Sequence, residues 1–271
     1  MSARQAFSRD QLPSAIARST IASSRPSAPS QPPAAAPRVK RLVYASSVAA
    51  YGFHDEPGRP DVFTEDVAPR GTDSFYYSAQ KAELEGLLER VLEGSDVDAY
   101  VFRPCIVSGP ESLLLIENIP YVSIGGRLPG AVRRLLEITP ALRPVIPDPG
   151  RRFQLVHADD VAGAMRAAVA GRGEPGVYNL AAEGLLTFSD VAEELGWYVL
   201  PVPQVSVDLT AEVVRRLPFL PPAAEWLQAF RVPVIMDSTK ARRKLSWRPK
   251  HDARQTLHAT VAGARERGLL G

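Results

Sequence analysis

The chain has 271 residues and only one cysteine, Cys105. No internal disulfide can form, which indicates a reducing compartment, and we expect a cytoplasmic protein. Long apolar runs are also lacking, because none reaches the roughly 18 residues of a membrane span. Neither sign of charge is in excess: 32 Lys and Arg stand against 30 Asp and Glu, a net charge of +2. This balance argues against a nucleic-acid partner, and the composition is that of an ordinary globular protein.

Acidic residues are nearly absent from residues 1–38, where Asp10 is the only one. The segment is rich in Ser, Ala, Arg and Pro, with prolines at positions 26, 29, 32, 33 and 37. Such a composition cannot bury enough apolar surface to order the chain, so we expect a disordered tail. An organelle transit peptide has a similar composition, although the proline tract fits one poorly.

An apolar run over residues 41–45 is closed by Ser46 and Ser47. This pattern is typical of a buried parallel strand whose carboxyl end opens into a loop. A second run, residues 97–102, predicts another strand that ends in Arg103 and Pro104. Ligands of open α/β sheets bind at the carboxyl ends of strands. The sequence therefore predicts an α/β fold with Ser47 at its functional edge.

Between these strands, residues 75–93 predict a helix, and Asp73 or Ser74 is the expected cap. Its apolar residues recur at helical spacing: Leu84, Leu87, Leu88, Val91 and Leu92. Tyr77 and Lys81 are i and i+4 on this helix and share a face.

The pairing of Tyr77 with Lys81 is suited to proton transfer. An ammonium group beside Tyr77 lowers the pKa of its phenol from the ordinary value of about 10. Tyr77 can then exchange a proton with an alcohol or a carbonyl, while the Ser47 hydroxyl holds the same substrate oxygen. For the Tyr-x-x-x-Lys pair taken alone, a purely structural role is the alternative, because the motif is short and common.

The three motifs in this order resemble the extended short-chain dehydrogenase/reductase family, which includes the NAD-dependent epimerases and dehydratases. Ala45-Ser-Ser-Val-Ala-Ala-Tyr-Gly52 is similar to the family's serine strand, in which the serine four residues before the tyrosine is catalytic, here Ser47. Tyr77 and Lys81 match its catalytic pair. Residues 103–110 resemble the segment whose backbone lies against the nicotinamide. The resemblance extends over about residues 39–257.

The resemblance implies the C-terminal half of a Rossmann-type parallel sheet, with a substrate-binding part at about residues 111–271. It also implies NAD or NADP as cofactor, bound by Tyr77, Lys81, Pro104, Cys105, Ile106 and Val107. The expected substrate is a small molecule that reacts at a hydroxyl or carbonyl carbon by oxidation, reduction, epimerisation or dehydration. Dimerisation through the Tyr77 helix is common among relatives. We expect no metal, because His54 has no partner at ligand spacing.

The glycine-rich turn of a dinucleotide-binding unit is missing. Such a unit opens with a strand, a Gly-x-x-Gly-x-x-Gly turn and a helix that receives the pyrophosphate, and no such turn precedes Val39. The glycines at 125 and 126, and those at 171, 173 and 176, do not follow a strand and open a helix, so we expect loops there.

We therefore expect that on the order of a hundred residues of the sheet are absent, leaving an open edge. A wrong start or a frameshift would explain this, with residues 1–38 a non-native reading of the upstream region. A truncated pseudogene product is the alternative. The alternative function is accordingly a catalytically silent fragment or binding protein.

Farther along, residues 153–162 predict a strand running into a helix, with Asp159 or Asp160 as its cap and His157 in a structural role. We expect another strand at residues 176–181, helices at 188–195 and 252–267, and a capped helix within 237–249. Residues 140–150 are an expected loop, and 197–234 an expected substrate-side cover. Relatives that act on nucleotide sugars often carry an arginine at the position of Phe153, and its absence weakens a nucleotide-sugar assignment.

Overall fold

The computed structural model describes residues 39–119, 121–122, 143–203 and 232–270. The expectations for the tail, for the glycines at 125 and 126, and for most of the cover segment fall outside these residues. Among the described helices, none has the length and apolar character needed to cross a membrane.

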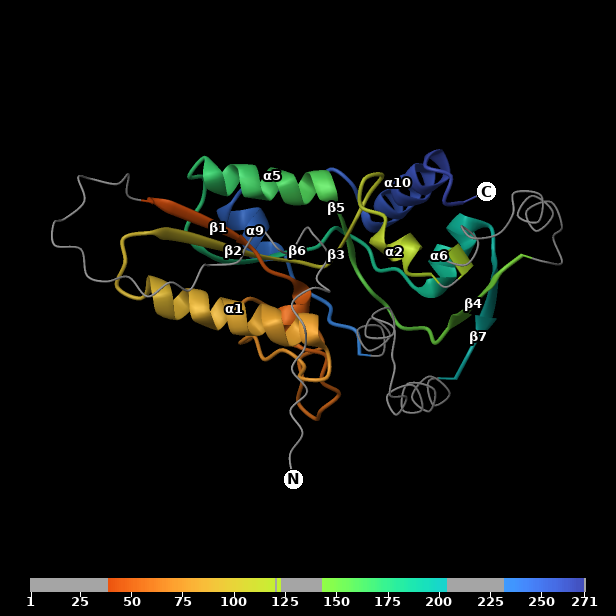
Figure 1. The fold of residues 1–271 in the computed structure, drawn as a ribbon, viewed down its shortest axis with the longest axis horizontal. Coiled ribbons are helices and arrows are strands. Elements are labelled where there is room, and N and C mark those ends of the chain that lie inside the picture. The colour runs from red at the N-terminus through yellow and green to blue at the C-terminus, as the bar shows by residue number, and fades with distance from the viewer. Residues whose placement is uncertain (1–38, 120, 123–142, 204–231, 271) are drawn as a thin grey trace, which may run out of the picture. The chain divides into compact units, whose positions relative to one another are not determined.

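A parallel sheet forms the centre of the fold. Its strands are β1 (Arg41–Ala45), β2 (Asp98–Pro104) and β6 (Gly176–Leu180), in the order β1-β2-β6. Helix α1 (Tyr76–Leu92) lies on one face of the sheet and α5 (Ala158–Val169) on the other (Figure 1). The predicted α/β class is confirmed. Among the described strands, β1 pairs with β2 alone.

Shorter elements continue the fold beyond the carboxyl ends of this sheet (Figure 1). A 3₁₀ helix, η3 (Val48–Tyr51), follows β1 directly. Two further parallel pairs are β3 (Ile106–Ser108) with β5 (Leu155–His157), and β4 (Val145–Asp148) with β7 (Tyr198–Pro201). The remaining helices are α2 (Leu114–Glu117), α6 (Phe188–Leu195), α9 (Thr239–Lys244) and α10 (Ala253–Glu266).

Two of the expected helix caps are wrong. The N-cap of α1 is Phe75, which makes no side-chain cap bond, so neither Asp73 nor Ser74 has that role. The N-cap of α5 is His157, whose Nδ1 accepts a hydrogen bond from the Asp159 backbone N–H at 3.2 Å. His157 therefore has the structural role expected of it. It is the N-cap of α5, the position predicted for Asp159 or Asp160. Thr187 caps α6 with a capping box.

The loop expected at residues 140–150 is also partly wrong, because β4 lies within it. Val145 pairs with Tyr198, more than fifty residues along the chain, and local sequence gives no sign of such a partner. The glycines at 171, 173 and 176 lie between the end of α5 and the start of β6. They connect a helix to a strand, which confirms that they are not a dinucleotide-binding turn.

We expect opposite effects from two glycine-to-alanine substitutions in helices. A Cβ at Gly263 in α10 would lie 2.5 Å from the Pro110 Cα, whereas one at Gly86 in α1 would meet only the flexible Arg90 guanidinium, at 3.4 Å. Gly263→Ala should destabilise the fold by about 1–3 kcal/mol through overpacking. Gly86→Ala should stabilise it by about 0.5–1 kcal/mol, because alanine favours the helix. Urea unfolding of both variants checks this, and a stabilised Gly263→Ala would contradict the close packing of α10 on Pro110.

Candidate active site

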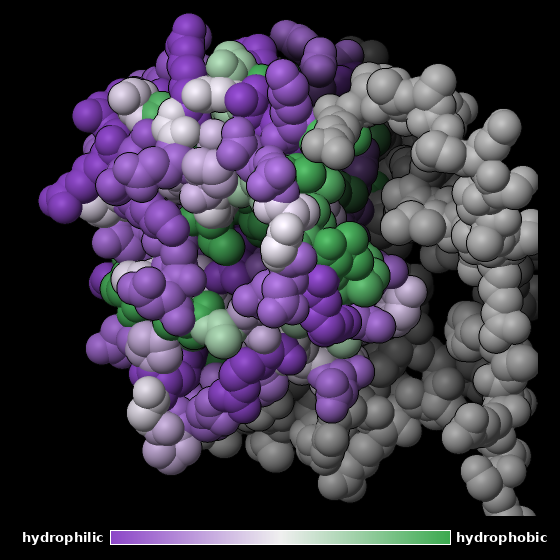
Figure 2. Space-filling model, turned by 90° about the vertical axis from the view of Figure 1, so that its left-hand side faces the viewer, coloured by the Kyte–Doolittle hydropathy of each residue, from purple (hydrophilic) through white to green (hydrophobic). Residues whose placement is uncertain are grey.

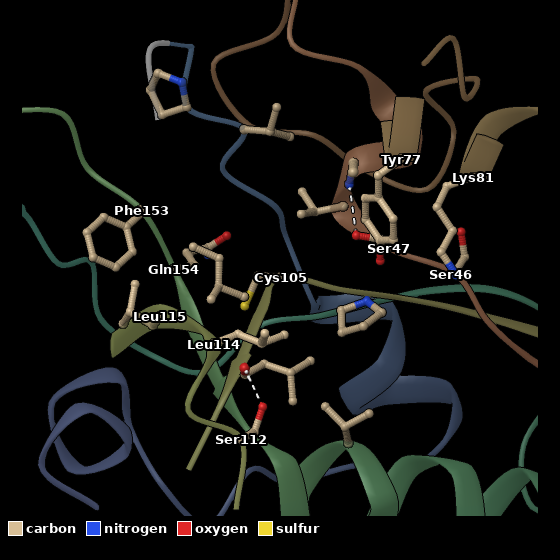
Figure 3. Close-up of a pocket in the computed structure, with 18 of the residues that line it drawn as sticks. Ser46, Ser47, Tyr77, Lys81, Cys105, Ser112, Leu114, Leu115, Phe153 and Gln154 are labelled. Atoms are coloured by element: carbon tan, nitrogen blue, oxygen red, sulfur yellow. Dashed lines mark hydrogen bonds between the residues drawn. The ribbon is translucent and has the colours of Figure 1, made fainter. Parts of the chain in front are cut away.

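A cavity of about 380 Å³ opens at the carboxyl ends of β1 and β2. Every residue predicted for catalysis or cofactor binding lines it: Ser47, Tyr77, Lys81, Pro104, Cys105, Ile106 and Val107. Figure 3 shows Ser47, Tyr77 and Lys81 on one side, with Leu114, Leu115 and Phe153 on the other. The sequence motifs, up to sixty residues apart, thus meet in one place.

Ser47 is held by its position between β1 and η3. Its backbone is extended, with φ −161° and ψ 156°, and it caps η3 by accepting a hydrogen bond from the Ala49 N–H at 3.2 Å (Figure 3). Its hydroxyl is also hydrogen-bonded to the Tyr77 phenol. The cap fixes the hydroxyl beside the tyrosine, so the local turn chemistry of β1 determines where this group points.

Tyr77 lies in the first turn of α1. Burial raises the pKa of its phenol, and the hydrogen bond with Ser47 opposes that rise. The expectation that Lys81 would lower this pKa is wrong for the geometry described. The ammonium lies over the ring, 5.6 Å from its centroid, and donates to the Ala45 carbonyl at 2.8 Å.

Lys81 is half-buried between two aromatic rings. Its Nζ is 5.3 Å from the centroid of Tyr44 and 5.6 Å from that of Tyr77. Burial lowers the pKa of the ammonium, and the charge of Glu85 opposes this. The aromatic faces favour a cation at this point, which places a positive charge at the wall of the cavity.

A buried polar network supports this wall, and the sequence analysis missed it. Arg103 and Glu85 form an ion pair with Nη2 and Oε2 2.6 Å apart, and their side chains are 3% and 6% exposed. The Ser46 hydroxyl donates to the same carboxylate. One available signal was the spacing of Glu85, one helical turn beyond Lys81 and on the same face.

Helix α1 turns a polar side toward the rest of the fold. Its buried residues are Ser78 and Glu85, and the Ser78 hydroxyl donates to the Ala49 carbonyl at 2.6 Å. The apolar repeat that predicted the helix is largely on the outside, with Leu84 38%, Leu87 41% and Val91 68% exposed. The helix was predicted correctly, but its apolar side does not form the core.

The opposite wall of the cavity is mostly apolar. Gln154 lies within it, but its amide exchanges two hydrogen bonds with the Met236 backbone, at 2.8 and 3.1 Å. Burial strongly raises the pKa of the Cys105 thiol, so this residue is suited to packing and not to thiolate chemistry. Within the described part of the chain, no three His, Cys, Asp or Glu side chains gather as a metal site would require.

Residues 33–181 match the NAD dependent epimerase/dehydratase family. The chain belongs to this family. An uncharacterized protein of Mycobacterium tuberculosis and one of Mycobacterium bovis are each 29% identical to it over 216 residues, 79% of this chain and 52% of the relative. The chain thus spans about half the length of the curated relatives it matches.

Solved structures of sugar-nucleotide epimerases share the fold of this chain. UDP-glucose 4-epimerase from Thermotoga maritima, solved with UDP-glucose, has a TM-score of 0.58 at 22% identity, covering 84% of this chain and 64% of that one. UDP-glucuronic acid 4-epimerase from Bacillus cereus, in complex with NAD, has a TM-score of 0.55 at 15% identity, covering 84% and 62%. The Rossmann-type fold and the family resemblance seen in the sequence are confirmed.

We expect Ser47→Ala to raise the pKa of Tyr77 further, because the hydrogen bond that opposes the effect of burial is lost. The variant should also lose about 1 kcal/mol of stability with the η3 cap. Titration of tyrosine Cζ by NMR measures the pKa, with Tyr77 assigned by its absence in Tyr77→Phe. Ser112→Ala is the control, since Ser112 lines the same cavity but donates to the Val107 carbonyl. An unchanged Tyr77 pKa in Ser47→Ala would contradict the described contact.

Proposed function

We propose that this chain is the catalytic part of an NAD(P)-dependent oxidoreductase or epimerase/dehydratase, in which Ser47, Tyr77 and Lys81 act on a hydroxyl or carbonyl carbon of a small molecule. The observation that carries the proposal is the contact of the Ser47 hydroxyl with the Tyr77 phenol, with the Lys81 ammonium over the same ring. In this reading residues 39–271 are an incomplete NAD(P)-binding domain, with the substrate-binding part from about residue 111. A single buried cysteine supports a cytoplasmic location.

The cavity wall fits one end of a nicotinamide dinucleotide. Tyr77 and Lys81 line the cavity together with residues 104–107, a set that suits a nicotinamide and its ribose. Structures similar to this one were solved with NAD or, for RMD from Pseudomonas aeruginosa, with NADPH. A bound nicotinamide would supply hydride transfer. The sequence has no glycine-rich turn for the pyrophosphate, so the residues present fit only the nicotinamide end.

The chemistry of the chain's own residues follows from their pKa shifts. Tyr77, with its pKa raised, holds its proton at neutral pH and can donate it to a carbonyl oxygen of the substrate. Ser47 orients that oxygen by a hydrogen bond. The Lys81 ammonium, which lies over the Tyr77 ring, keeps a positive charge beside the reacting groups.

The position of Phe153 bears on the substrate. Its ring lies in the wall opposite Tyr77, near Leu115 (Figure 3), where an arginine would suit a diphosphate. Arg151 and Arg152 line the same cavity and could receive an anion. The two named epimerases act on UDP-sugars, and we propose a small-molecule substrate here.

The second candidate function is a catalytically silent binding protein, and the missing glycine-rich turn favours it. Calorimetric titration of the folded chain with NAD and with NADP separates the two candidates. Saturable binding of either dinucleotide supports the enzyme. A folded chain that binds neither would favour the silent protein.

We expect Tyr77→Phe to reduce turnover by about 10²–10⁴-fold, because the proton-transferring hydroxyl is removed. Tyr76→Phe is the matched control, since Tyr76 precedes it on α1 but is 63% exposed and away from the cavity. The assay follows reduced nicotinamide by absorbance with a panel of ketones, alcohols and nucleotide sugars. Activity that survives in Tyr77→Phe would contradict the proposed role.

We also propose a homodimer through the outer face of α1, where Leu84, Leu87 and Val91 are exposed in one stripe. Figure 2, which views the end of the sheet where β1 and β2 begin, shows a mainly hydrophilic surface with apolar patches. Val91→Lys should shift the protein to monomer in sedimentation experiments. Val169→Lys on α5, where the valine is 65% exposed, should not. A monomeric parent protein, or equal effects of both variants, would contradict this interface.

A further inference from the structure

Polar groups attach α1 to the chain segment that follows β1. The Ser78 hydroxyl donates to the Ala49 carbonyl at 2.6 Å, and the Lys81 ammonium donates to the Ala45 carbonyl at 2.8 Å. One turn farther along the helix, the Glu85 carboxylate accepts from the Ser46 hydroxyl. The helix that carries Tyr77 and Lys81 is thus placed by directional contacts.

Glu85 is the residue at which three elements meet. Its Oε1 accepts from Ser46, beyond the end of β1, and from the Arg103 Nε on β2 at 3.0 Å. Its Oε2 accepts from the Arg103 Nη2 at 2.6 Å. Arg103 is itself held, since its guanidinium lies 4.5 Å from the centroid of the Tyr51 ring and donates to the Val67 carbonyl at 3.3 Å. One carboxylate therefore joins α1 to the ends of both strands.

We propose that Glu85 is a positioning residue: its carboxylate, paired with Arg103, sets where Tyr77 and Lys81 stand relative to Ser47. This inference rests on the proposed function for its catalytic meaning. Ser46 is bonded to Glu85 and is followed directly by Ser47, so loss of the carboxylate would let the serine and the helix move independently. The Ser47–Tyr77 contact would then be lost.

The Glu85 carboxylate also affects the pKa of Lys81. The groups around the Lys81 ammonium are the phenols of Tyr44 and Tyr77, the Ala45 carbonyl and Glu85 on the next turn. Burial lowers the pKa of Lys81 and Glu85 opposes that effect. Removing the carboxylate charge should therefore lower the pKa of Lys81, so that the ammonium loses its proton at a lower pH.

A buried ion pair can also be only structural, and a double variant separates the two roles. Glu85→Gln alone leaves the Arg103 charge buried without a partner and is expected to unfold the chain. Glu85→Gln with Arg103→Met removes both charges at similar volume, an exchange that buried pairs often tolerate. The glutamine oxygen can still accept from Ser46.

The experiment uses the full chain with labelled lysine and tyrosine. NMR follows Lys81 Nζ and Tyr77 Cζ through a pH titration, and Lys81→Arg and Tyr77→Phe give the assignments. In the folded double variant we expect the Lys81 pKa to fall and the Tyr77 Cζ signal to move. The control is Glu56→Gln with Arg70→Met, which removes a carboxylate–guanidinium pair that is 43% and 55% exposed and should change neither signal.

Unchanged Lys81 and Tyr77 signals in a folded double variant would overturn the inference and leave a structural ion pair. If the double variant does not fold, Glu85→Asp gives the second test, because it keeps the charge but withdraws the carboxylate by one methylene. A Tyr77 signal that does not move in Glu85→Asp would overturn the positioning role. These signals need neither cofactor nor substrate, so an inactive parent protein would contradict the proposed function alone.

Discussion

The ion pair between Glu85 and Arg103 lies where β1, β2 and α1 converge, and it is removed from water almost completely. Two charges in such a place must satisfy each other's hydrogen bonds, because an unpaired buried charge costs roughly 3–5 kcal/mol. Here the carboxylate accepts from both strand ends, through Ser46 and Arg103. The geometry of the cavity wall depends on this pair, since the same helix carries Tyr77 and the same strand end leads into Ser47.

The helices on the two faces of the sheet are held by different interactions. On one face, α5 packs through small apolar residues, and Ala164 and Ala168 are fully buried. On the other, α1 attaches through Ser78, Lys81 and Glu85. The hydrophobic effect is non-directional, whereas hydrogen bonds fix both distance and direction. The helix that must hold reacting groups is therefore the one attached by polar contacts, and its apolar stripe is left outside.

Short sequence patterns correctly predicted the features that depend on neighbouring residues in the chain. The run before Ser46 became β1, the spacing of Tyr77 and Lys81 placed both on one face of α1, and residues 104–107 reached the same cavity, because parallel strands end at one edge of a sheet. The features that the sequence did not predict depend on residues far apart in the chain. The pairing of β4 with β7 and the burial of Glu85 against Arg103 follow from contacts that no short window of sequence contains. The predicted N-cap of α5 was wrong for a different reason: the imidazole of His157 accepts the capping hydrogen bond that an aspartate usually accepts.

The electrostatics of the cavity also explain why the expected effect of Lys81 on Tyr77 is not found there. Burial disfavours the charged form of either group, so it raises the pKa of the phenol and lowers that of the ammonium. The Lys81 ammonium donates to the Ala45 carbonyl and lies over the Tyr77 ring, 5.6 Å from its centroid. In the proposed reaction, donation of a proton by Tyr77 to a carbonyl oxygen therefore needs no prior ionisation. The reverse direction needs a phenolate, which burial disfavours and the hydrogen bond with Ser47 favours.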